Sequence, residues 1–190
     1  TVVNAAGANA GKVAALAGVA LPVSPRQRNV FVFDCRETLD PAVPLLIDPT
    51  GVYVRPESGG YICGVSPPAD QDQDGDTNDI EVDYPWFEEV VWPTLAHRIP
   101  AFETIKLSGA WAGYYDYNTV DQNGIVGAHP ALANFYFANG FSGHGLQQAP
   151  AVGRAMAELL ISGAFKTIDL SRFCFERFES GDLVLERNIV

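Results

Sequence analysis

Two glycine-rich segments, NAAGA at residues 4–8 and GFSGHG at residues 140–145, constrain the fold more than any other feature of the sequence. Each follows an apolar, β-prone run and precedes a predicted helix. Glycine permits positive φ angles and a close backbone approach. A helix that begins at such a turn directs its N–H groups and positive dipole end at a bound anion. The two segments therefore predict nucleotide or flavin contacts. The alternative is that the glycines only let strand and helix pack closely.

The first half of the chain predicts one helix and several short strands. Val2 and Val3 indicate the end of a buried strand, so we expect the chain to be a fragment that begins inside a domain. Residues 8–19 form the predicted helix, with Val13, Leu16 and Ala17 on its apolar face. The strands expected at residues 29–33, 45–47, 52–54 and 61–64 are separated by turn residues, which indicates an antiparallel meander.

In the second half, Asp83 is a predicted helix N-cap, and Pro93 should end or kink that helix before residue 98. Residues 102–117 and 134–137 are predicted strands, with a turn at residues 121–124. The longest helix should run over residues 145–161, with Pro150 in or near its first turn and Gly163 as its stop. Its buried face is predicted from Val152, Met156, Leu159 and Leu160. The fold class is α/β or α+β with a sizeable antiparallel sheet.

Charge and cysteine content exclude several classes of protein. The net charge of −11 over 190 residues argues against a nucleic-acid or anionic-membrane surface. No apolar run approaches the roughly 20 residues that span a bilayer. The three cysteines, Cys35, Cys63 and Cys174, form no CxxC pair, which favours a soluble protein in a reducing compartment.

Four ordered blocks together resemble the FAD-dependent D-amino-acid oxidase superfamily, which includes sarcosine oxidase and dimethylglycine dehydrogenase. The first block is NAAGANA at residues 4–10, and the second is WAG at residues 111–113 followed by Thr119, Asp121 and Gly127. The third is FANGFSGHG at residues 137–145. The fourth is DLSRF at residues 169–173 followed by RF at residues 177–178. The resemblance implies the C-terminal part of that fold. Residues 1–20 would end the FAD-binding domain, residues 21–125 would form the substrate-binding domain, residues 126–165 would return to the FAD-binding domain, and residues 166–190 would be a tail.

The resemblance implies noncovalent FAD, because no cysteine lies near Trp111 where sarcosine oxidase links its flavin. The chain has no GxGxxG motif for the FAD pyrophosphate. We therefore expect it to need the N-terminal FAD-binding half of the same chain, and the isolated fragment to be inactive. The implied cofactor contacts are Ala6, Gly7, Ala8, Gly140, Phe141, Ser142, Gly143, His144, Gly145 and Leu146.

The implied activity is oxidation of a CH–NH or CH–NH2 group, in an amine or N-methyl amino acid, by hydride transfer to the flavin. Both cations that bind a substrate carboxylate in the family are replaced, because Tyr115 and Gln147 stand in their places. Arg28 or Arg26 could supply the missing charge, or both could be surface residues. Tyr114, Tyr115 and Tyr117 could line an aromatic pocket or simply alternate between the faces of a sheet. The catalytic residues are unknown.

The runs at residues 95–104, 111–124 and 140–150 resemble in particular a mitochondrial branch of the family that is linked to assembly of respiratory complex I. This resemblance implies a mitochondrial location. It also implies an alternative function, in which the flavoprotein fold is a non-catalytic assembly chaperone whose partners are complex I intermediates.

Two further features have competing interpretations. His144 is better explained as a structural residue of its turn than as a proton shuttle. The acidic loop at residues 70–81 has the EF-hand spacing of calcium ligands, but Ser66, Pro67 and Pro68 exclude an entering helix. We expect a solvated loop and no metal, with calcium as the weaker alternative; its ligands would be Asp70, Asp72, Asp74, Asp76 and Glu81.

Overall fold

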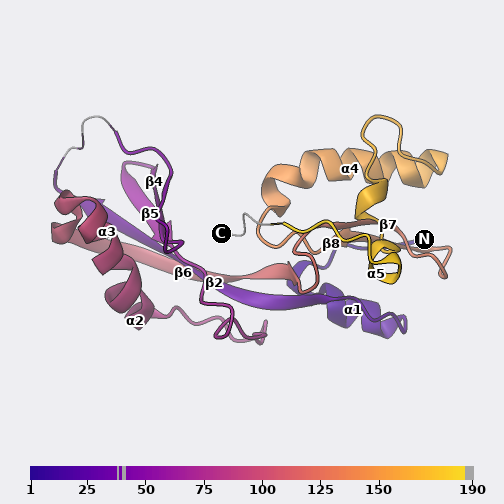
Figure 1. Cartoon of the computed structure of the whole chain (residues 1–190), viewed down its shortest axis with the longest axis horizontal. Coiled ribbons are helices and arrows are strands. Elements are labelled where there is room, and N and C mark those ends of the chain that lie inside the picture. Colours follow the sequence, from indigo (N-terminus) through magenta and orange to yellow (C-terminus); the bar gives the residue numbers. More distant parts are fainter. Residues whose placement is uncertain (38, 40–41, 187–190) are drawn as a thin grey trace. The chain divides into compact units, whose positions relative to one another are not determined.

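The computed structural model describes residues 1–37, 39 and 42–186. They form two compact units (Figure 1). Among the described residues, the first unit contains residues 1–26 and 115–186, and the second contains those between 27 and 114. The last four residues of the predicted tail, 187–190, lie outside the described residues. In the described part of the chain, no helix is long and apolar enough to cross a membrane.

The first unit is built on a three-stranded mixed sheet in the order β1-β8-β7. β1 (Val2–Asn4) pairs in parallel with β8 (Phe135–Asn139), and β8 pairs antiparallel with β7 (Ile125–Ala128). The strand predicted at residues 134–137 is confirmed. The prediction that Val2 and Val3 are buried is wrong, because β1 is an edge strand and these side chains are 49% and 39% exposed.

After β1 the chain makes a 3-10 turn, η1 (Gly7–Asn9), and then α1 (Ala10–Leu16), so the helix begins later and ends earlier than predicted. Its predicted apolar face is wrong. Ala10 and Ala14, one turn apart, are fully buried, whereas Leu16 is 89% exposed. Small side chains make this contact because the helix lies close to its neighbours.

The long helix α4 (Gly145–Ser162) is confirmed, and Gly163 ends it with a left-handed φ of 74°. Figure 1 shows it running over β7 and β8. Pro150 lies inside the helix rather than in its first turn, so the helix lacks the N–H that would bond to the carbonyl one turn earlier. The predicted buried face is confirmed at Met156 and is wrong at Leu160, which is 41% exposed, while Ala155 is buried without having been predicted.

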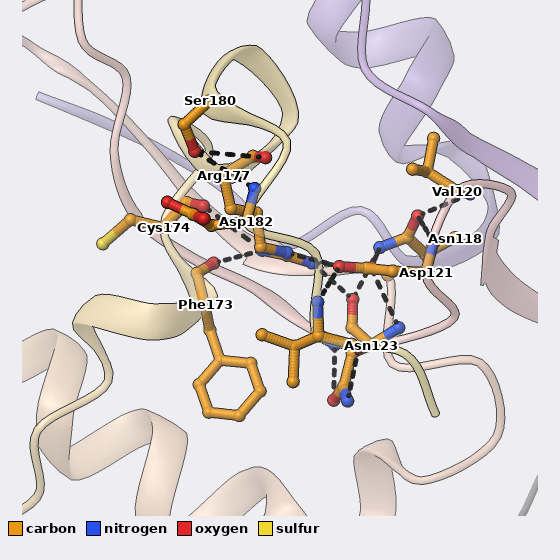
Figure 2. Close-up of polar contacts among 12 residues, drawn as sticks. Asn118, Val120, Asp121, Asn123, Phe173, Cys174, Arg177, Ser180 and Asp182 are labelled. Atoms are coloured by element: carbon orange, nitrogen blue, oxygen red, sulfur yellow. Dashed lines mark hydrogen bonds and ion pairs between the residues drawn. The ribbon is translucent and has the colours of Figure 1, made fainter. Parts of the chain in front are cut away.

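The C-terminal segment contains η4 (Ser171–Phe173) and α5 (Arg177–Ser180). A buried ion pair joins it to the turn after β6 (Figure 2). Arg177 Nε lies 2.7 Å from Asp121 Oδ2, and Arg177 Nη2 lies 2.9 Å from Asp121 Oδ1. Asn118 Nδ2 donates to the same carboxylate at 2.7 Å. Both charges are therefore paired and hydrogen-bonded, as buried charges must be.

The core of this unit combines α1, the sheet and the C-terminal segment. Phe135, Phe137 and Phe175 pack as neighbouring rings, 5.4 and 5.2 Å apart between successive centroids. The other buried members of the cluster are Ala10, Ala14, Val19, Leu21, Val23 and Ile125.

The second unit contains most of a five-stranded sheet in the order β3-β4-β5-β2-β6. Its strands are β2 (Val23–Cys35), β3 (Leu46–Ile47), β4 (Tyr53–Glu57), β5 (Gly60–Gly64) and β6 (Ile105–Asn118). The predicted meander is confirmed, because β3, β4 and β5 pair antiparallel in sequence order and β5 pairs antiparallel with β2. Phe102, predicted to begin β6, lies instead in the 3-10 helix η3 (Pro100–Thr104).

One irregular helix belongs to the same unit, formed by α2 (Tyr84–Trp86), the π turn η2 (Phe87–Val91) and α3 (Trp92–Arg98). Asp83 caps it as predicted, because its Oδ1 accepts the Trp86 N–H at 3.1 Å. Pro93 does not end it. The wider π turn precedes Pro93, which lies at the start of α3, and the helix continues to Arg98. The core of this unit combines Phe87, Val91, Leu95 and Phe102 with sheet residues such as Phe31.

We predict that Arg177→Met destabilises the protein by about 3–5 kcal/mol, because it leaves the Asp121 carboxylate buried without its cation. Burial opposes ionisation of Asp121, but Arg177 and backbone N–H groups outweigh it and hold the carboxyl pKa below its ordinary value of 3.8. This stabilisation is present above pH 3.8 and is lost as the pH falls through the lowered pKa.

Urea unfolding of the full-length protein at several pH values measures the effect. The gap between wild type and Arg177→Met should be largest near neutral pH and shrink in acid. Arg172→Met is the matched control, because Arg172 is exposed and should change stability by less than about 0.5 kcal/mol. Equal losses in both variants would show that the pair contributes nothing.

Candidate functional site

The two glycine turns lie at the same edge of one sheet. β1 and β8 are parallel neighbours, with Asn4 opposite Phe137, so the segments that follow them leave the sheet on the same side. Asn139 Nδ2 donates to the Asn4 carbonyl at 2.9 Å, and Asn4 Nδ2 donates to the Ala10 carbonyl at 2.9 Å. The buried Asn139 amide thus joins the two segments, and the buried Asn4 amide holds the first turn to the helix that follows it. Sequence reasoning did not identify Asn139, whose only signal was its place directly before the second turn.

The first turn contains the predicted contacts Ala6, Gly7 and Ala8. Gly7 has a φ of +55°, and a Cβ added there would meet nothing within 4 Å. Glycine is therefore favoured at this position by the positive φ angle and not by close packing. Close packing belongs to Gly11, where an added Cβ would lie 2.4 Å from the Val23 carbonyl oxygen. The packing alternative thus fits Gly11 and not Gly7.

The second turn depends on three left-handed residues: Gly140, Ser142 and Gly143 have φ values of 75°, 50° and 99°. An added Cβ at Gly143 would lie 2.5 Å from the Tyr115 ring, so both φ and space require glycine there. Ser142 is fully buried, and its Oγ accepts the Asn118 N–H at 3.0 Å. The turn is therefore held in one shape by strand β6 beneath it.

Asp116 is the second contact of β6 with this turn. Its Oδ2 accepts the Gly140 N–H at 2.7 Å, and its carbonyl accepts the Ser142 N–H at 3.2 Å. Burial raises the pKa of the Asp116 carboxyl, although the turn's N–H groups act in the opposite direction. Nothing in the sequence indicated this contact.

The start of α4 presents the remaining predicted contacts, Gly145 and Leu146, with His144 at the N-cap. The His144 N–H donates to the Phe141 carbonyl at 3.0 Å, and its side chain makes no capping bond. No acidic residue lies in the first turn, and Leu146 is 90% exposed. No carboxylate of the first turn therefore neutralises the positive end of this 18-residue helix.

These residues fit a flavin. The turn and α4 provide N–H groups and a positive dipole end, which suits the negatively charged N1 and C2 carbonyl region of a reduced flavin. Where the turns meet, the buried Asn139 Oδ1 accepts no hydrogen bond from any described residue. A buried acceptor of this kind is a place where a bound group or water donates.

The predicted substrate-pocket residues divide between the units, with Tyr115 and Gln147 in the first and Arg28 and Tyr114 in the second. Tyr115 packs under Gly143, and Gln147 is exposed in the first turns of α4. Tyr114 OH donates to the Asp79 carbonyl at 2.7 Å. Burial, with the charges of the acidic loop, raises the pKa of Tyr114. The two neighbouring tyrosines thus contact different segments, as alternation along a strand predicts.

Neither candidate arginine is a simple surface residue. Arg28 is 7% exposed, and its guanidinium forms a bidentate pair with Asp72, at 2.8 Å to Oδ1 and 2.9 Å to Oδ2. The Arg26 guanidinium lies over the Tyr117 ring, 5.4 Å from its centroid. Arg28 therefore already holds a carboxylate from its own chain.

The acidic loop does not gather the predicted calcium ligands. Asp72 is committed to Arg28, and Asp76 Oδ1 accepts the Asn78 N–H at 3.0 Å. Within the described residues, no group of three or more His, Cys, Asp or Glu side chains is placed to hold a metal ion. The residues at the EF-hand spacing therefore do not converge on one point as calcium ligands would. The three cysteines are free thiols.

Comparison with known proteins places this geometry in a family. The family described as FAD dependent oxidoreductase matches residues 1–159. The chain is 53% identical over 202 residues to "FAD-dependent oxidoreductase domain-containing protein 1" of Xenopus laevis, covering 100% of this chain and 40% of that protein. The corresponding Bos taurus protein is 52% identical, with 41% of its length covered. The chain thus spans about two fifths of these relatives.

Among solved structures, L-proline dehydrogenase from P. horikoshii is similar with a TM-score of 0.80 and 31% identity, over 96% of this chain and 48% of that one. The match covers both units, and the arrangement of β1, β8 and α4 around the glycine turns accompanies the sequence match over residues 1–159. The chain therefore belongs to the DAO family of FAD-dependent oxidoreductases.

Proposed function

We propose that the full-length protein is an FAD-dependent oxidoreductase that oxidises the CH–NH or CH–NH2 group of an amine or N-methyl amino acid. The observation that carries this proposal is the pair of glycine turns at one sheet edge, with α4 beginning at the second turn. The similarity to L-proline dehydrogenase supports it, because L-proline is itself a secondary amine.

In this proposal, Ala6, Gly7 and Ala8 hold the nucleotide side of the noncovalent cofactor, and the residues of the second turn through Leu146 hold the ring. Gly143, His144 and Gly145 would face its C2 end. Bound FAD supplies the two-electron acceptor that no side chain provides. The chain's own part is to fix these donors in place, and Tyr115 does so from below by filling the space at Gly143.

We further propose the division predicted from the sequence, with residues 1–20 and 126–165 as FAD-binding parts, residues 21–125 as the substrate-binding part and residues 166–190 as the tail. A neutral amine needs little acid–base help, so we assign His144 at the N-cap of α4 to shaping the turn.

The test is to express the chain together with the rest of the full-length protein and to measure bound FAD by its absorbance. We expect a yellow protein whose flavin is bleached without oxygen by at least one compound in a panel of N-methylated amines and amino acids. A colourless protein that ignores added FAD would refute the proposal. The panel's parent compounds without the N-methyl group serve as controls for secondary-amine specificity.

A second candidate function is a flavoprotein scaffold for intermediates of mitochondrial complex I. It is favoured by the replacement of both family cations, at Tyr115 and Gln147, and by the resemblance of three sequence runs to the mitochondrial branch. It predicts a flavin that no panel compound reduces, together with co-purification of complex I intermediates from mitochondria.

We predict that Gly143→Ala lowers FAD retention by the full-length protein. The φ of 99° costs alanine about 1–3 kcal/mol, and the added Cβ must displace the Tyr115 ring. FAD per protein after gel filtration measures the effect. Gly153→Ala is the control, because Gly153 lies inside α4 with open space around it and alanine should stabilise that helix by about 0.5–1 kcal/mol. Unchanged FAD retention in Gly143→Ala would contradict the assigned role.

We predict that Asp116→Asn becomes more stable relative to wild type as the pH rises. Burial raises the folded pKa of Asp116 above 3.8, so the folded wild type keeps this proton longer than the unfolded chain. Wild type therefore loses stability from pH 3.8 up through the raised pKa. Asparagine cannot ionise, and its Oδ1 still accepts the Gly140 N–H. Urea unfolding from acid to neutral pH tests this. A difference that stays flat would contradict it.

A further inference from the structure

The first unit contains a cavity of about 300 Å³ that is lined by the start of α4, β7, the second glycine turn and the C-terminal segment. Its walls are mostly apolar, with Phe141 from the turn, Ala151 and Val152 from α4, and Phe173 from η4. Among the described residues, no charged side chain lines it. This size and lining are typical of sites for small, largely apolar ligands. An ionised ligand would lose its hydration there without gaining a partner of opposite charge.

The walls of this cavity are held in place by contacts within the chain. Arg177 Nη1 donates to the Phe173 carbonyl at 2.6 Å, and Arg177 Nη2 donates to the Asn123 carbonyl at 3.0 Å. Both lining residues are thus tied to the buried ion pair, and Figure 2 shows the Phe173 ring pointing away from that pair. An added Cβ at Gly124 would lie 2.6 Å from the Phe141 ring, so this ring lies against the Gly124 backbone. The cavity is therefore formed before any ligand binds.

Two glutamine side chains provide hydrogen-bonding groups at the cavity. Gln147 is exposed and Gln148 is half-buried, and both lie in the first turns of α4. In the described part of the chain, neither side-chain amide hydrogen-bonds to another residue. A side-chain amide carries no charge and can donate to a carbonyl oxygen. The cavity thus combines aromatic walls with neutral donors, which suits a planar ring that bears carbonyl oxygens.

We propose that this cavity binds an uncharged quinone, which accepts the electrons of the flavin. This rests on the proposed function, in which Phe141 belongs both to the turn that holds the flavin ring and to the cavity wall. Oxidation of the amine breaks its C–H and N–H bonds, forms a C=N bond and releases two electrons and two protons. The quinone takes up the same two electrons and two protons, and its two carbonyl oxygens become the hydroxyl groups of a hydroquinone.

The test uses the full-length protein with bound FAD, and the probe is duroquinone (tetramethyl-1,4-benzoquinone). The first readout is the thermal unfolding midpoint with oxidised flavin, which requires no turnover. The second is the rate of flavin reoxidation without oxygen, after reduction by one equivalent of dithionite. Ferricyanide, an anion that the neutral cavity should not bind, is the control oxidant. Ala151→Leu fills the cavity, and Ala157→Leu is its matched control, because Ala157 is exposed on the same helix and does not line the cavity.

We expect duroquinone to raise the unfolding midpoint of wild type and Ala157→Leu, and the reoxidation rate to saturate with duroquinone concentration because a complex forms first. Ala151→Leu should lose the midpoint shift and lower the rate at subsaturating duroquinone by about tenfold or more. Ferricyanide should oxidise the flavin of all three proteins at similar rates. Gln148→Glu places a charge at the cavity in a side chain of nearly the same shape, so it should also weaken the midpoint shift. It replaces Ala151→Leu if that variant does not accumulate.

The proposal is overturned if wild type shows no midpoint shift or no saturation with duroquinone, or if Ala151→Leu behaves like Ala157→Leu. Because dithionite reduces the flavin without an amine, failure of the proposed function is seen separately. A flavin that duroquinone reoxidises through the cavity but that no amine reduces refutes the proposed function and keeps the quinone site. A colourless protein that ignores added FAD refutes both.

Discussion

The parallel pairing of β1 with β8 is the constraint on which the candidate site depends. A parallel pair cannot be closed by a tight turn, and here the paired residues are separated by most of the chain. Only this pairing brings NAAGA and GFSGHG to one edge. The hydrogen bond from Asn139 to the Asn4 carbonyl lies where the two turns meet and satisfies a carbonyl at the strand end. A carbonyl left unpaired in a buried position would cost free energy.

The same unit contains buried polar groups at several further points, each tied to a bend in the chain. Asn118 and Asp121 order the turn after β6, and Arg177 fixes the C-terminal segment to it (Figure 2). Asp116 accepts the Gly140 N–H of the glycine turn, and burial at this position raises the pKa of its carboxyl. Hydrogen bonds between such buried polar groups contribute little net stability, but breaking one leaves a buried group unpaired at a cost in free energy. Other arrangements of the turns, which would break these bonds, are therefore disfavoured.

Local features of the sequence predicted most of the strands but not β7, together with the N-cap at Asp83, the stop at Gly163 and the positions of both glycine turns. Each of the predicted features is set by a few neighbouring residues. The errors arose where packing decides. In α1, Ala10 and Ala14 are buried in place of Leu16. The helix continues past Pro93 after a π turn, so the predicted end at Pro93 is wrong, and the alternative of a kink there stays a prediction. The pairs that join residues 44 and 56 positions apart, Arg28 with Asp72 and Asp121 with Arg177, had no local signal at all. The EF-hand spacing gave no indication of the partner of each carboxylate, and the structure pairs Asp72 with Arg28.

Charge distribution connects the turns with the choice of substrate. In the proposed function, the positive end of α4 and the N–H groups around Gly143 serve the flavin, so they are not available to a substrate anion. In the same proposal, Tyr115 and Gln147 stand where the resemblance implies two cations. An amino-acid carboxylate would therefore lose its hydration without gaining a partner among these residues. A neutral secondary amine avoids that loss, and it is also the protonation state from which hydride transfer proceeds without a dedicated base.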